Sequence, residues 1–436
     1  MREVPGHLEV RENELYIGGV NCVGLADEFG TPMYVYNGER IADNFGRLEG
    51  GLRRHADREV VVYYAVKANF NPVILRLLAE GGAYADILSI NEAKFALASG
   101  FEGDEIMFTG TSVSDDTLRY LLDAGALINV DSFSQMRRLA ELAPRGLDVS
   151  IRWNPGAGEG FDPKVITAGA ESHGRPIKFG IEESRVLEAY REAVDLGLNP
   201  IGLHQHIGSG WTGRDLEPFL ETVDSTLLIA RKVMKLLGRD LEQVDFGGGP
   251  GIPYRPEQRE FPIEAYGKGI CERVRRSGLG FDRICVESGR YLVGDSGVLL
   301  TTVNTVEEKN GNLIVGVDAG FNALLRPAFY GHYDEGGDFH EAYHEIVVTN
   351  RVKGKRDCCT IAGPLCETGD LLAIRRWMTR PEEGEVLAVL GAGAYGYSMA
   401  SVYNLQPRPA EVFVPDIKLA TRRGGFEDLT NLYRMD

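Results

Sequence analysis

A long hydrophobic run near the N-terminal end of the chain stops at a lysine. Residues 60–66 are apolar or aromatic without interruption, and Lys67 follows them directly. A run without alternating polar positions is typical of a strand buried on both faces in a parallel sheet. We therefore predict a strand over 60–69 whose lysine has little water to hold its charge. Such an amine can form a Schiff base, although a lysine at a strand end can also extend into solvent.

From about residue 38, helical and strand-like patterns alternate along the chain. Eight strand–helix pairs within about 250 residues indicate a (β/α)8 barrel of the TIM type. We place this barrel at residues 36–290. Its strands are expected near 60–69, 84–88, 105–108, 127–130, 147–153, 201–206, 241–246 and 283–286.

The pattern changes after residue 290, where short strand-like runs separated by turn residues predominate. These runs predict an antiparallel β domain of the sandwich or barrel type over residues 291–436. Short strand-like stretches within residues 1–35 are expected to join the same domain. The strand-like runs lie near 298–303, 313–317, 345–348, 358–361, 385–389 and 411–414.

Composition and charge narrow the class of protein. The 436 residues are 43% hydrophobic and 25% charged, the balance of a globular protein. The net charge of −17 argues against nucleic acid or an anionic membrane surface as a partner. Nothing in the sequence predicts a signal peptide or a membrane span. The six cysteines form no CxxC pair, so we expect reduced thiols in a cytoplasmic protein.

Polar side chains and glycines follow several predicted strands, and barrels carry their chemistry in the loops at these strand ends. Consecutive glycines let backbone N–H groups close on a phosphate. A phosphate cradle, a lysine and an acidic residue together predict pyridoxal 5′-phosphate, with Glu287 at the ring nitrogen and His206 stacked on the ring. Taken alone, His206 can equally be a core histidine. The strand-end residues are Lys67, Asp86, His206, Ser209, Gly247, Gly248, Gly249 and Glu287.

These strand ends belong to a longer series of motifs. In order they are YAVKAN at 64–69, DILS at 86–89, HQHIGS at 204–209, GGG at 247–249, ESGR at 287–290, DAG at 318–320, RPAFY at 326–330, GPLCETGD at 363–370 and GAYG at 393–396. The series resembles the fold-type III pyridoxal-phosphate decarboxylases, and most closely the diaminopimelate decarboxylase family. The resemblance extends from about Phe29 to Val414.

The resemblance implies roles for individual residues. Lys67 would carry the cofactor, and Tyr395 would contact both its phosphate and the substrate. Cys366, beside Glu367, would reach into the active site of the second subunit of a homodimer and act as an acid. The residues implied to hold the cofactor are Asp86, His206, Ser209, Gly247, Gly248, Gly249, Glu287, Gly289 and Arg290.

The substrate implied by the resemblance is an amino acid that carries a second amino group and a second carboxylate at its far end. Arg290, Arg326 and Tyr330 suit a distal carboxylate, because guanidinium binds carboxylate in a two-point fork. Glu367 suits a second ammonium. The implied reaction is decarboxylation of meso-2,6-diaminopimelate to L-lysine, in lysine biosynthesis. Alternatives are a decarboxylase of ornithine, lysine or a carrier-bound glutamyl group, a racemase, or a non-catalytic homologue that binds the cofactor.

Several stretches depart from the family pattern or match other motifs. Ser288 stands where the family usually has proline, and residues 155–181 and 333–339 form long or inserted loops that could border the substrate. Residues 340–344 match the zinc motif HExxH, but leave too little helix to bring both imidazoles to one face. Residues 391–396 match GxGxxG, but two prolines shorten the stretch in which a crossover helix would have to form. We therefore expect no metal site.

Overall fold

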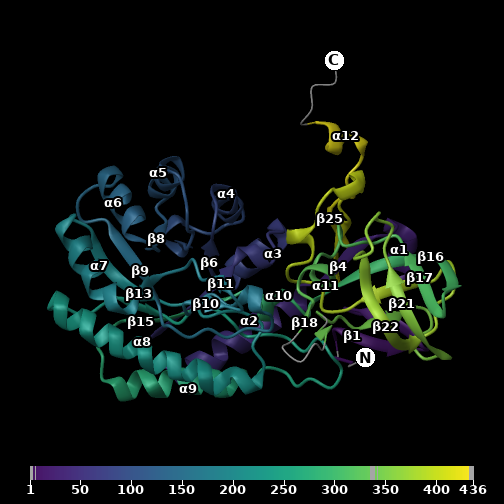
Figure 1. Ribbon diagram of the computed structural model, residues 1–436, viewed down its shortest axis with the longest axis horizontal. Helices are drawn as coiled ribbons and strands as arrows, with labels where there is room; N and C mark the ends of the chain where they lie inside the picture. The colour runs from purple at the N-terminus through teal and green to yellow at the C-terminus, as the bar shows by residue number, and fades with distance from the viewer. Residues whose placement is uncertain (1–2, 5, 334–338, 341, 432–436) are drawn as a thin grey trace. The chain divides into compact units, whose positions relative to one another are not determined.

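The chain divides into two compact units, which are described one at a time. The barrel unit comprises Ala42–Ile252 and Arg259–Leu292. The β unit comprises Met1–Ile41, Pro253–Gln258 and Val293–Asp436. The computed structural model describes residues 3–4, 6–333, 339–340 and 342–431 (Figure 1).

Eight parallel strands form a closed ring in the barrel unit, which is described throughout. Each strand pairs with the next along the chain, and the ring closes where β15 pairs with β5 in parallel. The predicted (β/α)8 barrel is therefore confirmed. The strands are β5 (Glu59–Ala65), β6 (Tyr84–Ile87), β7 (Ile106–Phe108), β8 (Leu127–Val130), β9 (Asp148–Asn154), β13 (Asn199–His204), β14 (Gln243–Asp245) and β15 (Arg283–Ser288).

Helices connect the barrel strands and flank them in Figure 1. Their starts are defined by short polar side chains: the hydroxyls of Ser89, Ser114 and Ser132 each accept a hydrogen bond from the amide three residues on. The helices are α2 (Gly38–Arg53), α3 (Pro72–Glu80), α4 (Ile90–Ala98), α5 (Asp115–Ala124), α6 (Phe133–Leu142), α7 (Glu183–Asp195), α8 (Leu216–Leu237) and α9 (Ile263–Ser277).

The sheet of the β unit is mixed rather than antiparallel. Its main path runs β22-β21-β17-β16-β4-β24-β25. β17 pairs with β21 in parallel, and so does β24 with β4, which corrects the prediction of an antiparallel domain. The strands on the path are β4 (Met33–Asn37), β16 (Gly297–Lys309), β17 (Asn312–Val317), β21 (Arg356–Ala362), β22 (Leu371–Thr379), β24 (Ala410–Val414) and β25 (Lys418–Thr421).

Two further strands, β20 (Ile346–Val348) and β23 (Val386–Val389), pair with each other, and β23 also pairs with β16. The N-terminal strands β1 (Leu8–Arg11), β2 (Glu14–Ile17) and β3 (Val20–Asn21) form a small sheet of their own. Leu8, Leu15 and Ile17 share a hydrophobic core with Val298 and Leu300 of β16. The N-terminal residues thus join the β unit through burial of apolar side chains. Among the residues that the structure describes, no helix is both long and apolar enough to cross a membrane.

Candidate active site

Lys67 lies just beyond the end of β5 rather than within the strand. The strand ends at Ala65, and Val66–Ala68 form one turn of 3-10 helix. This turn leaves the Lys67 side chain 33% exposed, so the expectation of a lysine with little water is wrong. Its Nζ lies 3.0 Å from Oδ2 of Asp86 on β6. Strand pairing of β5 with β6 therefore places the amine beside a buried carboxyl group.

Asp86 is 1% exposed and makes two polar contacts from its carboxyl group. One oxygen pairs with Lys67, and the other accepts a hydrogen bond from the hydroxyl of Thr109. Burial raises the pKa of Asp86 above its ordinary value, and the charge of Lys67 offsets this only in part. Asp86 therefore orients the lysine amine from a fixed position on the sheet.

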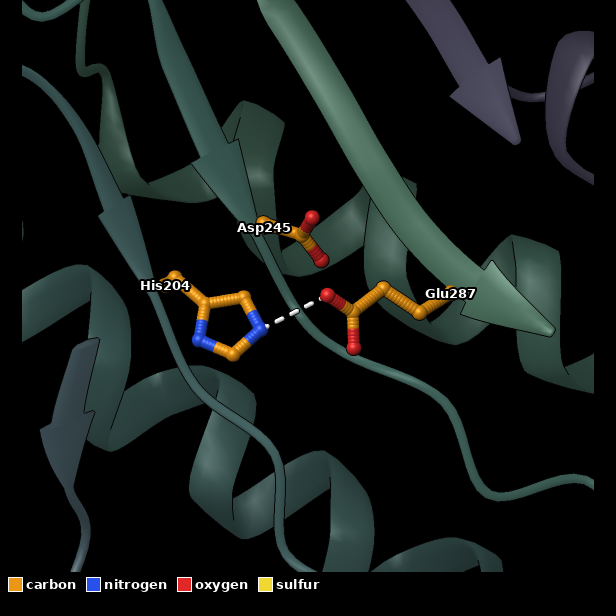
Figure 2. Close-up of side chains that lie close together, drawn as sticks. All are labelled: His204, Asp245 and Glu287. Carbon is orange, nitrogen blue, oxygen red and sulfur yellow. Dashed lines mark hydrogen bonds and ion pairs between the residues drawn. The ribbon is translucent and has the colours of Figure 1, made fainter. Parts of the chain in front are cut away.

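Three buried side chains from neighbouring strands meet inside the barrel, as Figure 2 shows: His204 of β13, Asp245 of β14 and Glu287 of β15. His204 Nε2 lies 2.9 Å from Oε1 of Glu287. Burial by itself would raise the pKa of Glu287, but the hydrogen bond and charge of His204 and the charge of Lys67 lower it to about 2. Glu287 is therefore a carboxylate at neutral pH, although it is only 4% exposed.

Asp245 behaves differently from Glu287, because burial and the neighbouring carboxylate raise its pKa well above the ordinary value. The ligand atoms of His204, Asp245 and Glu287 lie within 4.8 Å of one another, a spacing that a metal ion could use. The same arrangement also suits a pyridinium nitrogen, since an ionised carboxylate that a histidine holds in place can accept the hydrogen bond of a protonated ring.

The glycine segment after β14 leaves no room for side chains. A Cβ at Gly247 would collide with the carbonyl of Gln205, one at Gly248 with the carbonyl of Glu287, and one at Gly249 with the Trp211 ring. The N–H of Gly247 donates to Asp245 and that of Gly248 to His206 Nδ1, so these two groups hold the turn itself. Close packing of protein atoms against this turn therefore requires glycine at all three positions.

His206 is a neutral ring in a defined tautomer. Its Nδ1 accepts the hydrogen bond from Gly248 at 3.1 Å, so the proton sits on Nε2. Burial lowers the pKa of His206 to about 3. An uncharged imidazole suits stacking on an aromatic cofactor ring.

Arg290 supplies a cation beside Ser209. Its Nη2 lies 3.3 Å from the Ser209 hydroxyl, and its guanidinium lies 4.8 Å from the ring centroid of Phe161. A Cβ added to Gly289 would lie 2.9 Å from the Cβ of Ala68, so the turn before Arg290 packs against the Lys67 turn. Arginine, serine hydroxyl and bare backbone are donors that suit a phosphate.

The long loop 155–181 packs against the segment that carries His206 and Ser209. The Phe161 amide donates to the Ser209 carbonyl at 3.1 Å, and the Thr167 hydroxyl donates to the His206 carbonyl at 2.9 Å. The loop therefore supports the residues expected to hold the cofactor.

The remaining predicted site residues lie in the β unit. Arg326 begins the short helix α11 (Arg326–Phe329) and is 1% exposed. Its guanidinium lies 4.2 Å from the ring centroid of Tyr254 and 6.0 Å from that of Tyr330. Tyr395 has a φ of +56°, a left-handed conformation that costs energy for a residue with a Cβ and is concentrated at functional sites.

Cys366 and Glu367 lie on an exposed turn of the β unit with two polar neighbours that the sequence did not single out. Asn404 Nδ2 lies 3.3 Å from the Cys366 sulfur. The Tyr403 hydroxyl donates to Glu367 at 2.6 Å and lies 3.9 Å from the same sulfur. Hydrogen bonds to Glu367 and Cys366 raise the pKa of Tyr403, so its proton is retained.

The chain is similar to known decarboxylases along most of its length. Residues 47–294 match the family described as pyridoxal-dependent decarboxylase, pyridoxal binding domain. A diaminopimelate decarboxylase of Methanothermobacter thermautotrophicus is 44% identical over 97% of this chain and 96% of its own. The chain belongs to the diaminopimelate decarboxylase family. Another family member, from Aquifex aeolicus, is 35% identical over 98% of this chain and 97% of its own.

Solved structures of family members have the same fold. A diaminopimelate decarboxylase of Methanocaldococcus jannaschii superposes with a TM-score of 0.88 at 31% identity, covering 97% of this chain and 96% of that one. The enzyme from Helicobacter pylori, solved with L-lysine, has a TM-score of 0.84 at 32% identity. The match covers 94% of this chain and 99% of that one. The resemblance in the motifs is thereby confirmed at the level of the family.

Some polar residues near the site had no assigned role in the sequence. His204 stands two residues before His206, and alternate residues of a strand share one face. This spacing could have predicted that His204 lies on the same side of the strand as His206. Asp245, Tyr403 and Asn404 carried no such signal. The predicted residues divide between units: Cys366, Glu367, Arg326, Tyr330 and Tyr395 belong to the β unit and the others to the barrel unit.

The described residues of the HExxH and GxGxxG motifs do not form the helices that zinc or dinucleotide binding would need. Glu341 of HExxH lies outside the described residues, and His344 is fully buried against Arg326. The GxGxxG stretch follows β23 but continues into a single 3-10 turn, Tyr397–Met399, rather than a crossover helix.

We expect His204→Leu to lower the free energy of unfolding by about 3–5 kcal/mol at neutral pH, because it leaves the Glu287 carboxylate buried without its partner. In the wild type the pKa of Glu287 lies below its usual 4.5, so the ionised Glu287 stabilises the fold above pH 4.5, and this stabilisation is lost as pH falls toward about 2. In the variant the pKa of Glu287 should lie above 4.5. Protonation of Glu287 at low pH then removes the cost of an unpaired buried carboxylate. The gap in melting temperature between wild type and variant should therefore narrow from about pH 8 to about pH 5.

The control is His173→Leu, which removes an exposed histidine of the same unit. A gap for His204→Leu that is constant with pH, or that widens toward acid, would contradict this account of Glu287.

Proposed function

We propose that the protein is a pyridoxal-phosphate-dependent carboxy-lyase that converts meso-2,6-diaminopimelate to L-lysine. The observation that carries the reaction class is the Lys67 amine, held 3.0 Å from Asp86 and electrostatically coupled to the Glu287 carboxylate. Membership of the diaminopimelate decarboxylase family supports the choice of substrate.

The donors of the barrel unit fit the cofactor. Lys67 would bind its aldehyde, Ser209, Arg290 and the glycine turn would hold its phosphate, and Glu287 would hold the proton on its ring nitrogen. His206 presents a neutral ring for stacking. When bound, pyridoxal phosphate supplies the electron sink for the pair left behind when carbon dioxide departs.

The chain must also deliver a proton to the carbon that loses its carboxylate. We assign this task to the Cys366 thiol, acting in the site of a second subunit of a homodimer. Its exposed position and its exposed neighbours Val402, Tyr403 and Leu405 support a role at a subunit surface. The free state of the described cysteines supports a cytoplasmic location.

Arg326 and Tyr330 are assigned to the distal carboxylate of the substrate, Glu367 to its distal ammonium and Tyr395 to both cofactor and substrate. A lysine/ornithine decarboxylase of Vibrio vulnificus shares the fold, with a TM-score of 0.74 at 19% identity. Its substrates lack a distal carboxylate, so comparing substrates with and without that group separates the two functions.

The cofactor assignment predicts that borohydride reduction fixes pyridoxal phosphate on Lys67. Lys67→Ala should lose the yellow colour of bound cofactor, the covalent label and turnover, since no other amine lies beside Asp86 among the described residues. Lys94→Ala, on the exposed face of α4, is the matched control and should keep all three. Peptide mass mapping that finds the label on another lysine would overturn the assignment.

The shared site predicts complementation between inactive variants. Lys67→Ala and Cys366→Ala should each be inactive, yet a mixture that exchanges subunits should recover up to about a quarter of wild-type activity, because half of the dimers are mixed and each has one intact site. Activity is measured alongside native mass spectrometry of differently tagged subunits. Confirmed exchange without recovery would exclude a composite site.

The assignment of Arg326 to the distal carboxylate makes a prediction about the choice of substrate. A buried guanidinium left without its carboxylate partner costs about 2–5 kcal/mol, so wild-type kcat/KM should be about 30- to 3,000-fold lower for lysine or ornithine than for diaminopimelate. Arg326→Ala should greatly reduce turnover of diaminopimelate, because the distal carboxylate of the substrate then has no guanidinium to bind. The cofactor colour should remain, and the preference for diaminopimelate over lysine should shrink. Arg351→Ala removes a β-unit arginine paired with Glu385 and should leave the preference unchanged. Wild-type protein that already prefers lysine or ornithine would refute the substrate assignment.

A further inference from the structure

A buried histidine contacts the arginine assigned to the substrate carboxylate. His344 is fully buried, and its Nε2 lies 2.6 Å from Nη1 of Arg326. Both residues belong to the β unit. His344 is the last residue of the HExxH match and has no role in the proposed reaction.

The two ring nitrogens of His344 have opposite roles. Nδ1 lies 2.8 Å from the carbonyl oxygen of Leu390, and a carbonyl can only accept, so Nδ1 carries the proton. An arginine can only donate, so Nε2 offers its lone pair to Arg326. His344 is therefore neutral, in the Nδ1–H tautomer, and is a fixed acceptor for one arm of the guanidinium.

The backbone around His344 is anchored on both sides. Its carbonyl accepts a hydrogen bond from Arg376 at 2.7 Å, and the next residue, Glu345, accepts one from the Leu390 amide at 2.8 Å. Tyr343 precedes His344, and the centroid of its ring lies 3.6 Å from the guanidinium carbon of Arg376. The hydrogen bond from the imidazole to Leu390 thus lies one position beyond the last pair of β20 with β23, beside a backbone that the ladder holds.

Tyr254 contacts both His344 and Arg326. Its ring lies edge-on to the His344 ring, with 5.1 Å between the ring centroids, and its face lies 4.2 Å from the guanidinium carbon of Arg326. A hydrogen bond at one nitrogen and an aromatic face restrict both the rotation and the tilt of the guanidinium plane. Two-point binding of a carboxylate depends on that plane.

We propose that His344 is a positioning residue that orients the Arg326 guanidinium for the distal carboxylate of the substrate. The inference rests on the proposed function, because it assigns Arg326 to that carboxylate. His344 acts through Arg326, which it contacts directly. It therefore determines selectivity between substrates rather than the rate of the chemical step.

The test compares His344→Phe, which keeps a ring but removes the acceptor, with His344→Gln, whose side-chain oxygen can replace Nε2. His344→Phe should raise KM for diaminopimelate and reduce its preference over lysine by roughly 10- to 100-fold, the effect of one hydrogen bond to a charged group. Cofactor colour and kcat should change little. His344→Gln should restore most of the preference.

The matched control is Thr349→Val, which removes another fully buried hydrogen bond of the β unit, from the Thr349 hydroxyl to the Val386 carbonyl. It should leave the preference intact. In an Arg326→Ala background, His344→Phe should change the preference by less than about twofold, because the group it orients is gone. Equal effects in both backgrounds, or an effect of Thr349→Val as large as that of His344→Phe, would overturn the inference.

A readout without turnover separates this inference from the proposed function. In protein labelled with 15N-histidine, the His344 signals, assigned by their loss in His344→Gln, should show the neutral Nδ1–H tautomer, and Arg326→Gln should shift the Nε2 resonance. If wild-type protein fails to convert diaminopimelate, the proposed function fails while this measurement still tests the contact. A protonated His344, or an Nε2 resonance whose chemical shift is the same in Arg326→Gln as in the wild type, would overturn the inference.

Discussion

Burial of a negative charge inside the barrel is the constraint on which the candidate site depends. Glu287 is ionised although it is almost entirely enclosed, and an isolated buried carboxylate would take up a proton. It stays charged because His204 forms a hydrogen bond with it and the charge of Lys67 favours its ionised form. This buried charge also affects its acidic neighbours, since Glu287 helps to raise the pKa of Asp86 and that of Asp245.

Closure of the strand ring makes that compensation possible. Parallel strands present their carboxyl ends at one rim, so residues from β5, β6, β13, β14 and β15 meet although they are far apart in the chain. The pKa values of neighbouring carboxyl groups then shift in opposite directions, that of Glu287 to about 2 and that of Asp245 well above its ordinary value. A split of this kind lowers the cost of placing two acidic groups in one interior.

The β unit holds its functional residues by a different means. Arg326, Cys366 and Tyr395 lie on turns and short helices, where the sheet fixes only the flanking residues. Side-chain contacts therefore supply the rigidity: His344 and Tyr254 at Arg326, and Asn404 and Tyr403 at Cys366. The contacts that hold these residues are neutral hydrogen-bonding groups and aromatic faces rather than paired charges.

Periodicity and motif order were sufficient to predict the barrel, its eight strands, the family and the cofactor that the family binds. Those features depend on local patterns, such as the continuous apolar run before Lys67 and the glycines at 247–249. The sequence did not predict the turn that exposes Lys67, the parallel pairs in the β unit, or the strand β22. That strand contains an arginine with φ of +46° and pairs with shifted register, so its pattern of apolar positions is broken.

What only the tertiary structure decided was the partner of each polar group. His204 is bound to Glu287 from a position 83 residues away, and His344 meets Arg326 after the chain has turned back from α11. A charge state or a tautomer depends on the atoms that surround a group in space, and strand pairing brings those atoms together from distant segments. Residue types along the chain therefore determined which chemistry was available, and packing decided which nitrogen donates and which carboxyl group stays ionised.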